Sequence, residues 1–397
     1  MMKFIKYLLI ILVLVLISYL YFDYNGPEEI LLEKSNLFGF KATHAKDLMI
    51  QTSDDSGNIW ASRGMIIYKL EKGAAKFKRI AHVPTGFSVF WLRNFSIIRQ
   101  FTMRPECIEM VASSKGSICA MSAGIIWFKA YNEREFKPTH TLKHYSKKNQ
   151  GILNNGILQM TDSTLYYGEY FRNEKGKENV CVYESIDFGD SWNIKYTFTP
   201  GEIRHIHAVQ KDIYSGNAWI CTGDNEKNSK IGFTNDNFKT IDIIGTNSEK
   251  FTATQLSFTP EYVYWGSDGF NLEDCGIYRW KRSNRELSKL VTVRGCVFFT
   301  TVLKNGTLIF TTDREATPFE NDLFTRMVVI DKNGKSKVFR CGIWNKRDGF
   351  FRQYAKLRMP RQQSNSPYLI LSVLKHKGID DNDLFIIEED EILKNMN

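Results

Sequence analysis

The chain has 397 residues, of which 43% are hydrophobic and 14% aromatic. This length allows one large repeat fold or two ordinary domains, and the aromatic content favours β-sheets over helical bundles because flat rings suit a pleated surface. The formal net charge is +9, but basic and acidic residues are interspersed without a basic block. That pattern fits acidic glycans, anionic lipids or a mixed solvated surface better than nucleic acid. The seven cysteines include no CxxC pair, which argues against structural zinc.

Residues 1–25 form the first predicted element, a membrane-anchoring helix. Lys3 and Lys6 precede an apolar run from Tyr7 to Phe22 that contains no charge and ends in aromatic residues. Such a run predicts an uncleaved single transmembrane helix, with a cleavable signal peptide as the alternative. Because the positive-inside rule keeps the lysines in the cytoplasm, residues 26–397 are expected outside it, either tethered to the membrane or, after cleavage, secreted or periplasmic.

The remaining chain is a repeat of apolar strand-like stretches. One such stretch starts at each of seven positions, Asn58, Ser117, Thr164, Asn217, Tyr262, Thr307 and Tyr368. Each is preceded by another apolar strand and a turn, and is followed by a third strand and a polar hairpin. A recurrence of roughly 45 to 60 residues with four strands per unit is typical of propeller blades. The sequence therefore predicts an all-β propeller of seven four-stranded blades, with six or eight as alternatives if the long second unit divides differently.

Closure of the ring is expected to use the start of the chain. The last unit ends after its third strand, near Ile387, and so lacks a fourth. The segment 29–34 (EILLEK) precedes the first unit and is placed to supply that strand. Joining the two ends in this way leaves no long exposed sheet edge. Residues 26–397 are accordingly predicted to form one propeller domain closed by its N-terminal strand.

One hairpin carries a recognisable motif. Ser185, Asp187, Gly189, Ser191 and Trp192 match every defined position of the pattern S-x-D-x-G-x-[ST]-W. Gly permits a turn residue with positive φ, and the Asp and Ser side chains can bond turn amides. A second copy at 234–241 keeps the Asp and a hydroxyl but lacks the Gly and Trp. The chain thus resembles the Asp-box (BNR-repeat) propellers, the superfamily that contains the sialidases, and the resemblance implies a structural role for this box rather than a catalytic one.

Sialidases of that superfamily also carry an F/Y-R-I-P motif whose Arg grips the substrate carboxylate. The segment 101–105 (FTMRP) is a poor approximation of it, although its Arg104 is kept as a candidate ligand contact. The departure from the motif argues against true sialidase activity.

Loops that follow the second strand and precede the first strand of each unit open on one rim of a propeller, where ligands usually bind. The candidate residues on this rim are of three kinds: arginines, aromatic residues and carboxylates. They are Arg104, Arg204, Arg314 and Arg352, then Tyr170 and Trp265, and then Glu169, Asp224 and Asp268. A guanidinium can grip a carboxylate or sulfate while acids accept hydroxyls or transfer protons. This mixture predicts a site for an anionic carbohydrate. The alternative is that these charges only neutralise one another between blades.

His205 and His207 are two residues apart on one predicted strand and so point to the same side. They could bind a metal together, abstract a proton or simply line the tunnel as a satisfied pair. They resemble, in residue type only, the histidines that act on uronic acids in some propeller polysaccharide lyases. No metal ligand or cofactor is assigned from the sequence. Catalytic roles are predicted for His205, His207, Glu169, Asp224 and Asp268, since glycoside hydrolysis would need two carboxylates.

Two classes of function follow. The first is a glycan-acting enzyme, either a sialidase-like glycoside hydrolase or a polysaccharide lyase. The second is a non-catalytic binding or assembly propeller of the cell envelope. The chain contains no Walker loop, Rossmann fingerprint, HExxH or EF-hand pattern, which disfavours nucleotide-dependent and classical metalloprotease functions.

Overall fold

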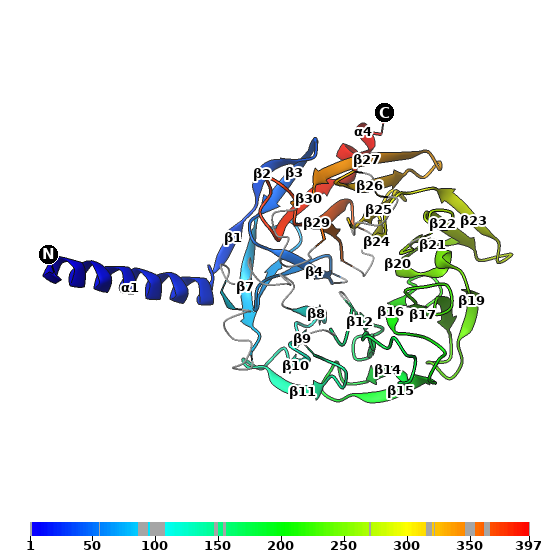
Figure 1. Ribbon diagram of the computed structural model, residues 1–397, viewed down its shortest axis with the longest axis horizontal. Helices are drawn as coiled ribbons and strands as arrows, with labels where there is room; N and C mark the ends of the chain where they lie inside the picture. The colour runs from blue at the N-terminus through cyan, green and yellow to red at the C-terminus, as the bar shows by residue number, and fades with distance from the viewer. Residues whose placement is uncertain are drawn as a thin grey trace.

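The computed structural model describes residues 2–54, 56–85, 94–95, 108–146, 150–153, 156–269, 271–314, 320, 322–345, 354–360 and 366–396. These residues form seven antiparallel sheets arranged around a central axis, so the seven-bladed all-β propeller is confirmed (Figure 1). Within each blade the strands follow one another from the centre outward.

The strands of the first four blades alternate in direction and are short. They are β4 (Met49–Ser53), β5 (Ile59–Arg63), β6 (Ile66–Leu70) and β7 (Lys76–His82) in blade 1; β8 (Glu109–Ala112), β9 (Ile118–Ser122), β10 (Ile125–Lys129) and β11 (Lys137–Thr141) in blade 2; β12 (Ile157–Gln159), β13 (Leu165–Gly168), β14 (Val180–Ser185) and β15 (Asn193–Phe198) in blade 3; and β16 (Ile206–Lys211), β17 (Ala218–Thr222), β18 (Lys230–Thr234) and β19 (Asp242–Thr246) in blade 4.

The last three blades continue the pattern. They contain β20 (Ala253–Phe258), β21 (Tyr262–Ser267), β22 (Ile277–Lys281) and β23 (Leu287–Val291) in blade 5; β24 (Val297–Val302), β25 (Leu308–Thr312), β26 (Phe324–Ile330) and β27 (Ser336–Ile343) in blade 6; and β28 (Lys356–Arg358), β29 (Tyr368–Leu374) and β30 (Asp383–Glu388) in blade 7. The described helices are α1 (Met2–Asn25), the 3₁₀ turn η2 (Glu249–Phe251) and α4 (Glu389–Lys394).

The ends of the chain close the ring differently from the sequence expectation. The strand that pairs with β30 is β3 (Phe40–Ala45), and β2 (Glu33–Leu37) pairs outside it as a fifth strand of blade 7. The predicted closing segment 29–34 is divided: β1 (Glu29–Leu31) pairs with β7 at the outer edge of blade 1, whereas Glu33 and Lys34 begin β2 in blade 7. The N-terminal segment therefore joins both blades that flank the closure.

Neighbouring blades pack through apolar clusters that each combine side chains from two sheets. Between blades 3 and 4, for example, Val182 of β14, Ile206 of β16 and Ile220 of β17 are all buried in one cluster. The two sheets approach so closely that a Cβ on Gly168 would lie 2.3 Å from the Ile206 side chain. Glycine at the end of β13 is thus required for blade 3 to bring the following residues against blade 4.

The turn from Ser185 to Trp192 has the hydrogen bonds expected of its residues. The Ser191 amide and hydroxyl donate to the Asp187 carboxylate at 2.8 and 2.6 Å, and the Gly189 amide donates to the Ser185 hydroxyl at 2.7 Å. Burial works against ionisation of Asp187, but the hydrogen bonds from Ser191 and Ser185 outweigh it and lower its pKa. The second copy repeats the pattern, because the amide and hydroxyl of Thr240 donate to Asp236 at 3.0 and 2.7 Å.

Helix α1 projects from the ring and ends where it meets blade 1 (Figure 1). Its last turn is fixed by Asp23, 3.3 Å from the Arg63 guanidinium, and by the Asn25 carbonyl, which accepts from Arg79 at 2.8 Å. In the part of the chain that the structure describes, no helix is long and apolar enough to cross a membrane. The predicted transmembrane helix is therefore not supported, and the location of the propeller outside the cytoplasm stays a prediction.

A buried histidine makes stability depend on pH. His376 is 2% exposed, contacts the Thr325 hydroxyl at 2.8 Å, and burial lowers its pKa from 6.5 to about 4. As the pH falls below 6.5 the unfolded chain takes up a proton before the folded chain does. The stability contributed by neutral His376 is thus present above pH 6.5 and is lost, on the order of 3 kcal/mol, by pH 4. We expect His376→Gln to flatten this part of the pH profile of Tm.

The measurement is thermal unfolding of both proteins between pH 7 and pH 4 in the same buffer series. An equal decline of Tm in wild type and variant would contradict the assignment to His376.

Candidate functional site

The candidate site lies where blades 3, 4 and 5 meet on the rim predicted for ligand binding. His205 immediately precedes β16, His207 lies within it, and Asp224 follows β17 in the same blade. The pairing register of β16 with β17 shifts between Ile206 and Ala208, so His207 is an extra residue in the strand. Such a bulge re-aims a side chain, and here it brings the two imidazoles together.

The three side chains form one tight group. The two Nε2 atoms of the histidines are 3.1 Å apart, and each lies close to Oδ1 of Asp224, at 3.0 Å from His205 and 3.1 Å from His207. The histidines are each 2% exposed, whereas the Asp224 side chain is 27% exposed. Access to the group from solvent is therefore from the side of Asp224.

Backbone carbonyls of the neighbouring blades orient both rings. His205 Nδ1 lies 3.0 Å from the Phe171 carbonyl of blade 3, and His207 Nδ1 lies 3.1 Å from the Ala253 carbonyl of blade 5. A carbonyl oxygen only accepts, so Nδ1 carries the hydrogen on both rings. Nε2 of each ring therefore faces Asp224, with a lone pair when the imidazole is neutral and with a hydrogen when it is protonated.

The environment sets the charge of this group. Burial lowers the pKa of His205 despite the favourable interaction with Asp224. Burial alone would raise the pKa of Asp224, but hydrogen bonding and charge interaction with both histidines hold it well below its usual range. The carboxylate therefore stays ionised beside imidazoles, of which His205 resists protonation.

Arg204 and Tyr170 complete the cluster. Arg204 contacts Oδ2 of Asp224 at 2.6 Å, and its other terminal nitrogen lies 3.9 Å from Glu174. The Tyr170 ring packs against His205 with centroids 4.3 Å apart. Tyr170 is brought there because the Ile206 amide donates to the carbonyl of Glu169, its neighbour in the chain, at 2.9 Å. We call these five residues, His205, His207, Asp224, Arg204 and Tyr170, the histidine cluster.

Glu169 points away from the histidine cluster. Its side chain accepts from the Cys181 amide at 2.9 Å and lies 3.8 Å from His144, whose ring stacks on Phe171 with centroids 3.9 Å apart. Glu169 is 3% exposed, and burial raises its pKa. It is thus a buried acid beside the cluster rather than a partner of Asp224.

The other predicted site residues lie elsewhere. Trp265 is fully buried, and its indole nitrogen donates to the Lys250 carbonyl at 2.6 Å, so its ring is part of the core between blades 4 and 5. Asp268 is buried after β21, where its amide donates to the Thr252 carbonyl. Arg314 is buried in blade 6 and pairs with Glu320 at 2.6 Å. Arg104 and Arg352 lie outside the described residues.

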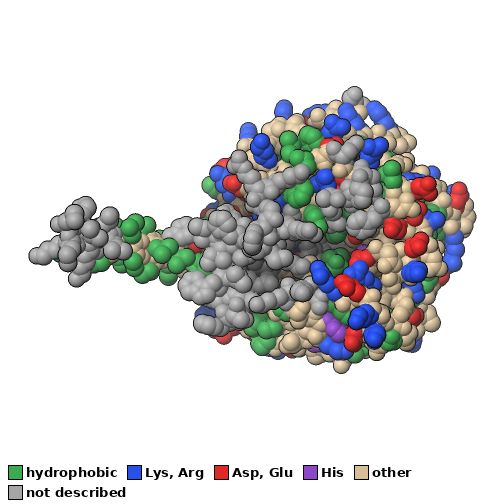
Figure 2. Space-filling model, viewed as in Figure 1, with side chains coloured by type: hydrophobic (Ala, Val, Ile, Leu, Met, Phe, Trp, Pro, Cys, Tyr) green, Lys and Arg blue, Asp and Glu red, His purple; other side chains and the backbone are tan. Residues whose placement is uncertain are grey.

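The sequence did not indicate Glu174 or His144, because both lie in loops without a motif. It also could not predict that the backbone carbonyls of Phe171 and Ala253 accept from the two histidines. The charges over the described part of the face in Figure 2 are mixed, with positive and negative side chains interspersed. This matches the interspersed charge of the sequence.

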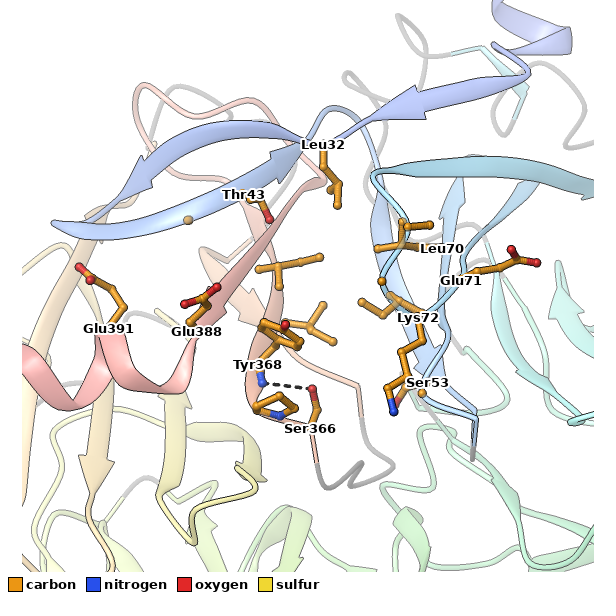
Figure 3. Close-up of a pocket in the computed structure, with 18 of the residues that line it drawn as sticks. Leu32, Thr43, Ser53, Leu70, Glu71, Lys72, Ser366, Tyr368, Glu388 and Glu391 are labelled. Carbon is orange, nitrogen blue, oxygen red and sulfur yellow. Dashed lines mark hydrogen bonds between the residues drawn. The ribbon is translucent and has the colours of Figure 1, made fainter.

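A separate groove of about 1160 Å³ lies between blades 7 and 1 (Figure 3). Leu32, where the chain crosses between the two blades, Leu70 and Tyr368 contribute apolar surface, whereas Lys72 and Glu388 are among its charged residues. Turns at the ends of β4, β6 and β30 line it, at the opposite ends of the strands from the histidine cluster. The described residues that line the groove include no histidine or cysteine.

No protein-family model matches the sequence, and no curated protein matches it. Among solved structures, an oligogalacturonate lyase from Vibrio parahaemolyticus has a TM-score of 0.58 at 12% identity, over 90% of this chain and 97% of that one. YCF48 bound to D1 peptide has a TM-score of 0.51 at 8% identity, over 90% and 94% of the two chains. A GH74 enzyme from Niastella koreensis has a TM-score of 0.48 at 12% identity over 73% and 44%. At these identities the likeness to the lyase and to YCF48 shows the fold alone, a seven-bladed β-propeller.

Proposed function

We propose that this protein is a glycan-acting propeller of the Asp-box kind, that the histidine cluster is its site, and that its ligand is a saccharide bearing carboxylates. The observation that carries the proposal is the convergence of Arg204, Tyr170, His205, His207 and Asp224 at one place on the rim. Clustered titratable groups with shifted pKa values are a mark of reactive sites.

The cluster has the parts that an acidic saccharide needs. Arg204 has a side-chain exposure of 23%, so part of its guanidinium faces solvent and can bind a carboxylate. The Tyr170 ring, packed on His205, offers a flat surface beside it. A propeller of the same fold is named an oligogalacturonate lyase, which makes this class of ligand compatible with the architecture.

The same geometry favours elimination over hydrolysis. Glycoside hydrolysis uses two carboxyl groups that face each other across the bond. Asp224 is held by two histidines and Arg204, and Glu169 faces Cys181 and His144, so these two acids do not form such a pair. In elimination a general base takes the proton at C5 of a uronic acid, and the electrons of that C–H bond form a C4–C5 double bond. The bond from C4 to the leaving oxygen breaks, and a general acid gives that oxygen a proton.

The test is to incubate the full chain with uronic-acid, sialylated and neutral oligosaccharides, measuring binding by calorimetry and product masses by mass spectrometry. We expect binding of the uronic-acid glycans and unsaturated products without added water. Arg204→Gln should weaken binding on the order of tenfold to a hundredfold, because a charge-assisted hydrogen bond is lost. Arg340→Gln, on the exposed outer strand β27, is the matched control and should bind as wild type does.

Other outcomes separate the alternatives. Products that gain water would overturn elimination in favour of hydrolysis. Binding without any product would support the non-catalytic recognition propeller. Absence of binding to all three classes would contradict the proposed ligand.

A further inference from the structure

The contacts within the histidine cluster cannot all be satisfied by protons. Both Nδ1 atoms donate to backbone carbonyls, so the close contacts among His205 Nε2, His207 Nε2 and Asp224 Oδ1 involve three atoms with lone pairs. If one imidazole carries a hydrogen on Nε2, that hydrogen can be shared between the two other atoms. The other imidazole nitrogen and the carboxylate oxygen then still face each other with lone pairs. Protons on both imidazoles place two hydrogens against each other. A proton on the carboxylate leaves the two nitrogens facing each other.

A single cation would satisfy all three atoms at once. Ligand atoms held at about 2.1 Å from one ion lie roughly 3.0 to 3.4 Å apart, depending on whether the geometry is octahedral or tetrahedral. The observed separations of 3.0, 3.1 and 3.1 Å fall at the octahedral end of that range. Three ligands also leave coordination positions open for water or a ligand.

The surroundings have the form expected around a metal. Histidines that bind metals generally donate their other ring hydrogen to a carbonyl or carboxylate, which fixes the tautomer and the ring orientation. Both histidines do this, through the carbonyls of Phe171 and Ala253. Arg204 holds the second oxygen of Asp224, leaving Oδ1 directed at the nitrogens.

We propose that His205 Nε2, His207 Nε2 and Asp224 Oδ1 bind one divalent transition-metal ion. Two imidazoles and one carboxylate favour zinc, iron(II) or a similar ion over calcium, which prefers oxygen ligands. The sequence assigned no metal here because two histidines and one distant aspartate do not form a recognisable spacing. The proposal deepens the proposed function in one respect, because an ion with open coordination positions on the side of Asp224 would contact the carboxylate of a bound saccharide. Metal binding itself does not depend on the proposed glycan ligand.

The experiment uses the full chain without an affinity tag, stripped with a chelator and titrated with Zn²⁺ by calorimetry, with Ca²⁺ as the comparison ion. We expect one Zn²⁺ per chain and much weaker or no binding of Ca²⁺. His207→Gln and Asp224→Asn should each weaken Zn²⁺ binding on the order of a hundredfold, because each removes a ligand. His140→Gln is the matched control, a partly buried histidine that contacts the Tyr167 hydroxyl in another blade, and should bind as wild type does.

Cobalt(II) provides a readout that does not depend on the variants. Bound by imidazole and carboxylate it gives visible d–d bands without the intense near-ultraviolet band of cobalt bound to thiolate, which distinguishes this site from the buried cysteines. Wild type that binds no ion, a cobalt spectrum of the thiolate type, or folded variants that bind Zn²⁺ unchanged would each overturn the proposal. No glycan is present in this experiment, so its failure and that of the glycan experiment are distinguishable.

Discussion

Replacing Arg358 by methionine is expected to lower the free energy of unfolding by about 3–5 kcal/mol. Arg358 lies on β28, the innermost strand of blade 7, and is fully buried. Its guanidinium contacts both carboxylate oxygens of Glu109 on β8 at 3.1 and 3.3 Å and Gln51 on β4 at 3.4 Å. The variant removes the Arg358 cation from beside the buried Glu109 carboxylate, which costs more than losing both charges together.

Denaturant unfolding of single and double variants measures this effect. The double variant Arg358→Met with Glu109→Gln should recover most of the loss, because neither charge then remains in the core. Arg340→Met, on the outer strand β27, is the control and should change stability by no more than about 0.5 kcal/mol. A double variant as unstable as Arg358→Met would show that packing, rather than the buried charge, is responsible.

Removing residues 1–45 is expected to abolish cooperative folding of the propeller. This deletion takes away β3, which pairs with β30, together with β1 and β2. It also removes Leu37 and Phe40, which are buried in the core shared by blades 6 and 7. Truncating even one such side chain typically costs about 2–5 kcal/mol, and the deletion additionally exposes the edge of β30. We expect a protein that aggregates or is rapidly digested.

A chain that lacks only residues 1–22 is the matched control. It retains Asp23 with its Arg63 contact and all of the closing strands. Limited proteolysis and circular dichroism should show a folded propeller for this control. A folded, protease-resistant protein from the longer deletion would mean that β28, β29 and β30 complete blade 7 without help from the N-terminal segment.

The candidate site was only partly predictable. His205 and His207 were expected to point to one side because alternate strand residues do so, but the bulge at His207 is what aligns their nitrogens. Asp224 was placed on the same rim by the strand order of the repeat. By contrast, Trp265 was predicted on the rim but lies in the core. The sequence does not distinguish these positions, because an aromatic residue at a strand end looks the same whether its ring faces the rim or the neighbouring blade.

The seven repeated units and the hydrogen-bonded turn from Ser185 to Trp192 could be predicted from the sequence alone, because strand alternation and turn chemistry are local and depend on consecutive residues. The tertiary structure alone decided that β3 closes the ring, and that His205 and His207 meet Asp224. The orientation of both rings comes from backbone carbonyls of blades 3 and 5. Any residue type supplies such a carbonyl, so no sequence pattern records it.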